Sequence, residues 1–106
     1  MKVKVSRRAK ALAIDKKTKF AVWKRDGGCC IFCGKPQPWN NANAHVVPRS
    51  KGGMGIEQNI VTACCDCHRA FDQSAERHNF MEKAVGHLKK HYPNWEKEQV
   101  LYNKYQ

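Results

Sequence analysis

The sequence predicts a small α+β domain in which two short strands and a helix are held together by two pairs of cysteines. Cys30 and Cys33 form the first pair, and Cys64 and Cys67 form the second. Two Cys-x-x-Cys pairs are typical of a tetrahedral zinc site, because each pair makes a tight turn that presents two sulfurs. A chain of 106 residues has a modest core, which a structural metal would help to stabilise.

The predicted strands lie between the cysteine pairs, and the predicted helix begins at the second pair. Residues 42–47 and 60–63 have the composition of short strands. Residues 65–73 are expected to form a helix that carries His68 and Asp72 four residues apart on one face. The resulting order is strand, loop, strand, helix.

A short helix is expected before the first cysteine pair. Thr18 is a candidate cap for a helix that ends at Arg25, with Phe20 and Trp23 one turn apart as its buried face. The sequence Asp26-Gly27-Gly28 then ends this helix and leads into the first pair.

Two further helices are expected after the second cysteine pair. Ser74 is a candidate cap for a helix over residues 75–91, with Phe80, Ala84 and Leu88 at helical spacing. Tyr92-Pro93 breaks that helix, and Asn94 is a candidate cap for a last one over residues 95–104, with Trp95, Tyr102 and Tyr105 as packing residues.

The charge of the chain predicts a polyanionic partner. The formal net charge is +11 and the isoelectric point is about 9.6. Half of the 20 basic residues lie within residues 1–25. Residues 1–17 are therefore a candidate basic arm, in which Arg7 and Arg8 either contact phosphates or are simply solvated. Membrane-surface binding is an alternative for such a charge, but no basic amphipathic helix supports it. No apolar run is long enough to span a bilayer, and no membrane partner is expected.

Cysteine use favours metal binding in a reducing compartment. Six cysteines would also suit a secreted disulfide-linked fold, and a redox Cys-x-x-Cys is a second alternative. However, the N-terminus has no apolar signal segment, and the paired spacing favours a metal. Cys29 and Cys65 are expected to be spare, because Gly34 follows the first pair and the Cys65/Cys67 spacing is wrong for the second.

The segment between and around the cysteine pairs resembles the HNH endonucleases over roughly residues 20–73. The resemblance is carried by the motifs Ala44-His45-Val46-Val47-Pro48-Arg49-Ser50-Lys51-Gly52-Gly53, Asn59-Ile60-Val61-Thr62 and Cys64-x-x-Cys67-His68-Arg69. His45, Asn59 and His68 occupy the three positions after which the family is named. One departure is Ala44, where many members carry an Asp or His metal ligand.

The resemblance implies a ββα-metal (His-Me finger) core that hydrolyses phosphodiester bonds. His45 would be the general base, since a neutral imidazole can take a proton from water near neutral pH. His68 would bind a divalent ion, Mg²⁺, Mn²⁺ or Ni²⁺, and Asp72 is either a further ligand or the partner of a surface ion pair or cap. Asn59 would either bind this ion or hold the hairpin loop.

Arg49 and Lys51, in the same loop, either contact phosphates or are solvated.

Together these observations predict a metal-dependent DNA endonuclease of low sequence specificity. Its expected parts are the basic arm 1–17, the zinc-containing nuclease core 18–73 and a helical extension 74–106. The alternatives are a noncatalytic zinc module that binds nucleic acid, for which Ala44 is the argument, and a nuclease active only with a partner protein. The extension resembles that of phage-type HNH proteins, some of which work beside the terminase. This implies a terminase partner and the cytoplasm of a bacterial or phage-infected cell, with a monomer or weak dimer expected.

Overall fold

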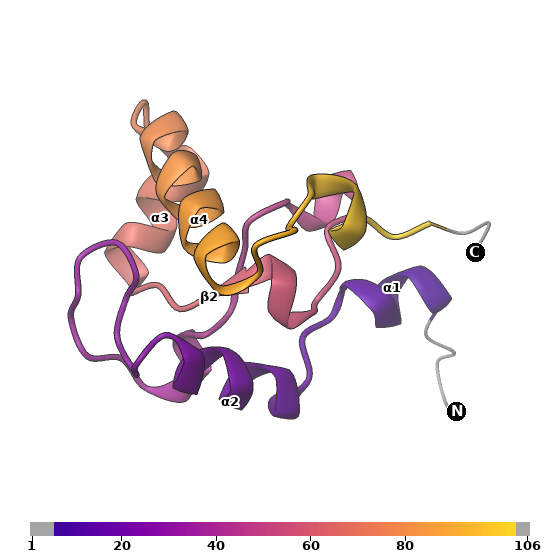
Figure 1. Cartoon of the computed structure of the whole chain (residues 1–106), viewed down its shortest axis with the longest axis horizontal. Helices are drawn as coiled ribbons and strands as arrows, with labels where there is room; N and C mark the ends of the chain where they lie inside the picture. Colours follow the sequence, from indigo (N-terminus) through magenta and orange to yellow (C-terminus); the bar gives the residue numbers. More distant parts are fainter. Residues whose placement is uncertain (1–5, 104–106) are drawn as a thin grey trace.

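The computed structural model describes residues 6–103 and places a two-stranded sheet between α2 and the α3–α4 hairpin (Figure 1). The helices and strands, in chain order, are α1 (Arg7–Leu12), α2 (Lys16–Arg25), β1 (Ala44–His45), β2 (Ile60–Val61), α3 (Cys65–Gln73) and α4 (Arg77–His91). Single 3₁₀ turns lie at Trp39–Asn41, Arg49–Lys51, Glu57–Asn59 and Lys97–Val100. The predicted strand, loop, strand, helix order is thus confirmed in a small α+β fold.

Helix α2 differs from the prediction in where it begins and in which residue it buries. Its cap is Asp15, whose carboxylate accepts a hydrogen bond from the backbone amide of Thr18 at 2.7 Å, so the helix starts before Thr18. The buried face centres on Val22, whereas Phe20 is 41% exposed. The predicted end is confirmed, because Gly27 and Gly28 both adopt a positive φ of 70°.

The sheet is shorter than predicted but has the predicted partners. Ala44 pairs with Val61 and His45 with Ile60 in an antiparallel ladder. The ladder continues by one hydrogen bond, from the Val46 amide to the Asn59 carbonyl at 2.8 Å. Alternation along β1 directs Ala44 into the main core, where it is 1% exposed.

Helix α3 has the predicted bounds, whereas α4 starts later than predicted. Ser74 does not cap α4; its backbone amide and its hydroxyl both donate to the Ala70 carbonyl, which ends α3. The hydroxyl also accepts from the Glu76 amide, so Ser74 forms the turn between the helices. On α4, Ala84 and Leu88 are buried as their spacing predicted.

The C-terminal segment forms a 3₁₀ turn in place of the predicted long helix. Glu96 and Gln99 cap this turn reciprocally, so Asn94 is not its cap. Trp95 is buried, and its indole donates to the Gln58 carbonyl at 2.6 Å. The segment then runs beside the loop that follows β1, since the Tyr102 amide donates to the Gly52 carbonyl at 2.8 Å. Residue 104 and Tyr105 lie outside the described residues.

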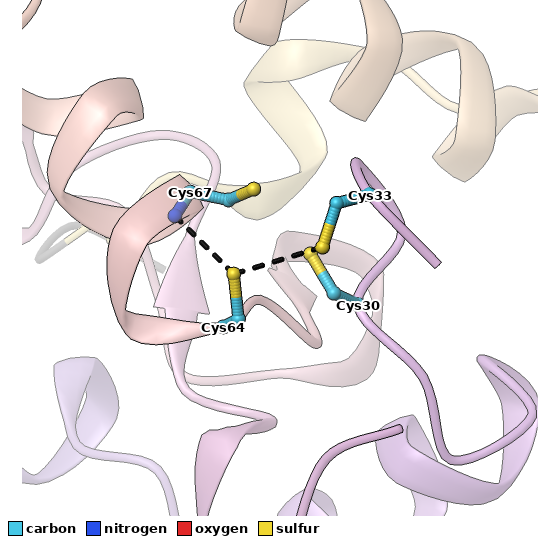
Figure 2. Close-up of side chains that lie close together, drawn as sticks. All are labelled: Cys30, Cys33, Cys64 and Cys67. Carbon is cyan, nitrogen blue, oxygen red and sulfur yellow. Dashed lines mark hydrogen bonds between the residues drawn. The ribbon is translucent and has the colours of Figure 1, made fainter. Parts of the chain in front are cut away.

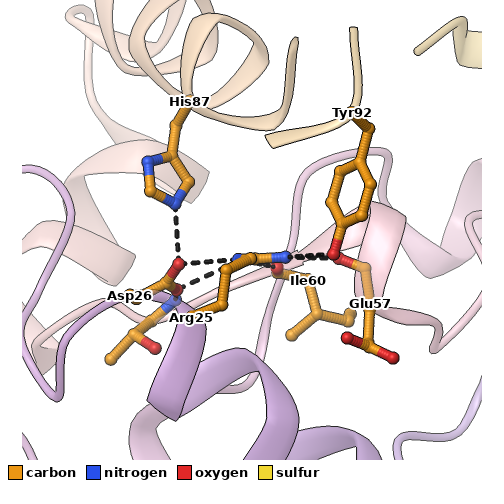
Figure 3. Close-up of polar contacts among 7 residues, drawn as sticks. Arg25, Asp26, Glu57, Ile60, His87 and Tyr92 are labelled. Atoms are coloured by element: carbon orange, nitrogen blue, oxygen red, sulfur yellow. Dashed lines mark hydrogen bonds and ion pairs between the residues drawn. The ribbon is translucent and has the colours of Figure 1, made fainter. Parts of the chain in front are cut away.

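A buried ion pair connects α2 to the sheet and to α4 (Figure 3). The Arg25 guanidinium makes two hydrogen bonds to the Asp26 carboxylate and donates to the Ile60 carbonyl at 2.7 Å. Asp26 also accepts from the Thr62 amide and lies 2.6 Å from His87 Nε2. Burial alone would raise the pKa of Asp26, but the hydrogen bonds from His87 and Arg25 lower it to about 2.

Within residues 6–103, no helix combines the length and the apolar character needed to cross a bilayer.

Candidate active site

The four predicted zinc ligands come together in one cluster (Figure 2). The sulfurs of Cys30, Cys33, Cys64 and Cys67 all lie within 4.8 Å of one another. The first pair sits in a loop that turns through Gly34, whose φ is 81° and whose amide donates to the Cys30 carbonyl. The second pair lies at the start of α3, where the helix N-terminus favours negative charge on sulfur.

The spacing and the ionisation of these sulfurs suit a structural zinc ion. Cys33 Sγ and Cys64 Sγ are 3.7 Å apart, close to the edge of roughly 3.8 Å expected for a tetrahedron of sulfurs at zinc–sulfur distances of about 2.3 Å. Burial would raise the pKa of Cys30, but backbone amides of the two turns lower it to about 7. Burial and the neighbouring sulfurs raise the pKa of Cys67 well above its ordinary value. A divalent cation would relieve this mutual repulsion.

The two spare cysteines lie outside the cluster. Cys65 is exposed and Cys29 is half-buried, and neither belongs to the group of four sulfurs.

A cavity of about 760 Å³ brings together two of the three predicted catalytic residues, His45 and His68, and the predicted ion ligand Asp72, but not Asn59. His45 reaches it from the end of β1, and His68 and Asp72 reach it from one face of α3. Ala44 does not line it, because strand alternation turns position 44 into the core. Two imidazoles and one carboxylate therefore line the cavity, and position 44 contributes no metal ligand.

His45 is held by the backbone of the N-terminal segment. Its Nε2 lies 2.8 Å from the carbonyl oxygen of Leu12, at the end of α1. A carbonyl can only accept, so Nε2 carries the proton and Nδ1 keeps its lone pair. Burial lowers the pKa of His45, and the charge of Arg49 lowers it further, although the bond to Leu12 opposes them. The imidazole is therefore neutral near pH 7.

His68 and Asp72 place two potential metal-ligand atoms close together on the cavity wall. His68 Nε2 and Asp72 Oδ2 are 3.4 Å apart, as expected for an i, i+4 pair on a helix. Both side chains are partly accessible, at 31% and 57% exposure. An imidazole nitrogen and a carboxylate oxygen are suitable ligands for a transition-metal ion, and the carboxylate alone is suitable for Mg²⁺.

Asn59 does not line the cavity and instead holds the loop that follows β1. Its side chain is fully buried, accepts from the Val47 amide at 2.8 Å, and donates to the carbonyls of Val47 and Met54. A Cβ at Gly53 would lie 1.8 Å from the Val47 carbonyl oxygen and 2.8 Å from Asn59 Nδ2. Only glycine permits this close approach.

The basic residues named from the sequence take different positions. Arg49 lines the cavity, whereas Lys51 lies on a neighbouring apolar pocket. Arg8 donates to the Arg49 carbonyl at 3.3 Å, and Arg7 is exposed on α1.

Sequence reasoning missed four polar residues of the cavity wall: Lys19 from α2, Asn43 just before β1, Ser50 in the loop after β1, and Arg77 at the start of α4. Asn43 is only two residues before His45, so strand alternation was a usable signal for it. The sequence contains no comparable signal for Lys19 or Arg77.

Comparison with known proteins identifies the family. The model of the HNH endonuclease family matches residues 30–84. The chain is also 32% identical over 87 residues to the type IV methyl-directed restriction enzyme EcoKMcrA of Escherichia coli (strain K12). The match covers 76% of this chain but 31% of that enzyme, so the chain spans about a third of its relative's length. No solved structure matches the chain. The chain belongs to the HNH endonuclease family.

Proposed function

We propose that this chain is a metal-dependent DNA endonuclease in which His45 is the general base. The observation that carries the proposal is the cavity shared by His45, His68 and Asp72. Three cations, Lys19, Arg49 and Arg77, line the same cavity and would attract a phosphodiester. The net charge of +11 supports a polyanionic substrate.

The proposed reaction starts with a proton transfer to His45. The Leu12 carbonyl fixes the tautomer, so Nδ1 takes the proton of a water molecule as its oxygen attacks phosphorus. The bond from phosphorus to the 3′ oxygen breaks, and that oxygen takes a proton from solvent, which leaves 5′-phosphate and 3′-hydroxyl ends. His68 and Asp72 would hold the divalent ion, which would supply positive charge to stabilise the departing oxygen.

Asn59 is proposed as a positioning residue and not as an ion ligand. Its carboxamide is buried and engaged with the loop backbone, and it is not among the residues that line the cavity. Its hydrogen bonds fix the loop that carries Arg49 and anchor the end of β1 beside His45.

The broader biological role stays a prediction. The name of the Escherichia coli relative describes methyl-directed restriction, but the chain covers about a third of that enzyme. We therefore propose for this chain only the cleavage of DNA. A phage role, a terminase partner and phosphate contacts by Arg7, Arg8 and Lys51 rest on the sequence alone.

The test is incubation of the purified protein with supercoiled plasmid, with Mg²⁺, Mn²⁺ or Ni²⁺ and without added ion. Nicked or linear plasmid that appears only with a divalent ion is the expected result. No cleavage with any of the three ions would favour a noncatalytic zinc module or a nuclease that needs a partner protein.

A further inference from the structure

The strongest feature outside the cavity is an aromatic pair on the surface of α2. Phe20 stacks on Trp39, with ring centroids 4.5 Å apart and planes 18° apart. Among the described residues, Phe20 is the one large hydrophobic side chain that is exposed, at 41%. One face of its ring is covered by Trp39, and much of the rest of the side chain is open to water.

The exposed ring lies in a setting of positive charge. Lys16, Lys17 and Lys24 are one turn before or after Phe20 on α2, so they share its helix face, and all three are exposed. The carboxylate of Asp15 caps the N-terminus of α2 and offsets part of this charge. Three lysines against one carboxylate leave this face positively charged, which favours a bound polyanion.

The pair packs against the fold and lies next to the cavity. The Trp39–Asn41 turn packs against α2, and the Trp23 indole anchors the approach to it by donating to the Gln37 carbonyl at 2.7 Å. Lys19 connects the two sites, since it lines the cavity and its Nζ lies 6.0 Å from the centroid of the Trp39 ring. A nucleotide stacked on the aromatic pair would therefore be close to a phosphate bound in the cavity.

We propose that Phe20 and Trp39 form a stacking platform for an unpaired base of single-stranded DNA beside the active site. A base in a duplex has both faces covered, so the platform selects DNA with unpaired bases near the cleavage point. The lysines around Phe20 contact the flanking phosphates, and the ring contributes the base-dependent part of the affinity. This inference rests on the proposed function, because it names the substrate class of the same site.

The test separates base stacking from phosphate contact by using matched oligonucleotides. Affinity is measured without divalent ion for a single-stranded oligothymidylate and for an abasic oligomer of equal length, which carries the same phosphates. Stacking is worth roughly 1–3 kcal/mol per base, so the oligothymidylate should bind at least about fivefold more tightly. Equal affinities for the two oligomers would overturn the proposal, and this comparison needs no variant.

Variants then assign the difference to the platform. Phe20→Leu should lower the affinity for the oligothymidylate to that for the abasic oligomer. Phe20→Tyr, which keeps an aromatic ring, should preserve the difference in affinity between the two oligomers. Lys24→Ala, on the same helix face, should weaken the binding of both oligomers alike. It should also reduce the slope of log affinity against log salt concentration by about 0.7. An undiminished difference in Phe20→Leu, with zinc content unchanged, would place the base contact elsewhere and contradict the assignment.

Plasmid cleavage keeps the two proposals separable. Ion-dependent cleavage together with base-independent binding would refute the platform alone. Base-dependent binding in a protein that cuts no DNA would refute the nuclease proposal and retain the platform.

Discussion

The proposed chemistry of the site depends on how the His45 imidazole is oriented. A histidine at the end of a two-residue strand has many rotamers open to it, and the Leu12 carbonyl selects one of them and one tautomer. A carboxylate in that place would raise the pKa of His45, whereas a neutral carbonyl orients the ring with less effect on its basicity. In the proposed mechanism, the N-terminal segment would therefore contribute to catalysis through a backbone atom that carries no sequence motif.

The pH dependence of cleavage should show this environment. Burial and Arg49 lower the pKa of His45 from its ordinary 6.5, and a general base must be unprotonated to act. The cleavage rate at saturating ion should therefore be maximal near pH 7. It should fall only below pH 6.5, as His45 becomes protonated. Single-turnover rates between about pH 5 and 8, with zinc content checked at each pH, measure this acidic limb of the pH profile. A limb centred above pH 6.5 would contradict the neutral imidazole.

Asp72 should set the ion requirement. Asp72→Ala removes the oxygen that lies 3.4 Å from His68 Nε2 and should raise the Mg²⁺ or Mn²⁺ concentration needed for half-maximal rate. Melting temperature and zinc content should stay near those of the parent, since Asp72 is 57% exposed. Asp66→Ala is the matched control, because Asp66 is exposed on the same helix but does not line the cavity. An unchanged ion requirement in Asp72→Ala would exclude it as a ligand.

At the scale of elements, the loop between β1 and β2 is held from three sides. Asn59 holds it from within, and the tail holds it through Val100 and Tyr102. On the N-terminal side, the Gly55 amide donates to the Ala11 carbonyl, and a Cβ at Gly55 would lie 2.1 Å from the Ala13 carbonyl oxygen. A short strand pair has little stability of its own, so these contacts position the cavity wall.

The buried ion pair makes a separate prediction about α2 and α4. Asp26→Asn leaves Arg25, whose side chain is 8% exposed, without its counter-charge. Loss of one partner from a buried pair typically costs about 3–5 kcal/mol, so the free energy of unfolding in urea should fall by about that amount. The matched control is Glu82→Ala, which breaks the exposed His78–Glu82 pair and should change stability by less than about 1 kcal/mol. Equal effects of the two substitutions would contradict the structural role of Asp26.

At the scale of the whole molecule, zinc is expected to couple the first cysteine loop to α3. The four thiolates would repel one another without the ion, so binding and folding should be linked. Chelation should melt the domain, and the protein should contain one zinc per chain by metal analysis. Cys29→Ser and Cys65→Ser, which change cysteines outside the cluster, should keep that zinc. Loss of zinc from either variant would show that the ligands are wrongly assigned.

The sequence was informative where ligand spacing and helical period carry the signal. The two cysteine pairs and the His68–Asp72 pair are each recognised from local spacing, and the four-ligand requirement of zinc then joins the cysteine pairs across about thirty residues. The sequence was uninformative where distant segments meet without such a motif. Nothing near His45 indicates Leu12, and nothing near Asp26 indicates His87, because each contact is made by folding. The exposed Phe20 was misjudged because an aromatic at helical spacing is usually buried, and here Val22 takes that place.

The most direct test of the account is the single-turnover cleavage rate of His45→Ala at saturating ion. A general base acts in the transition state, so the rate should fall by about 100-fold or more. Zinc content, melting temperature and DNA affinity should stay near those of the parent. His78→Ala, which changes an exposed histidine on α4, should cleave at the parental rate. A His45→Ala protein that cleaved at a near-parental rate would contradict the assignment of His45 as the base.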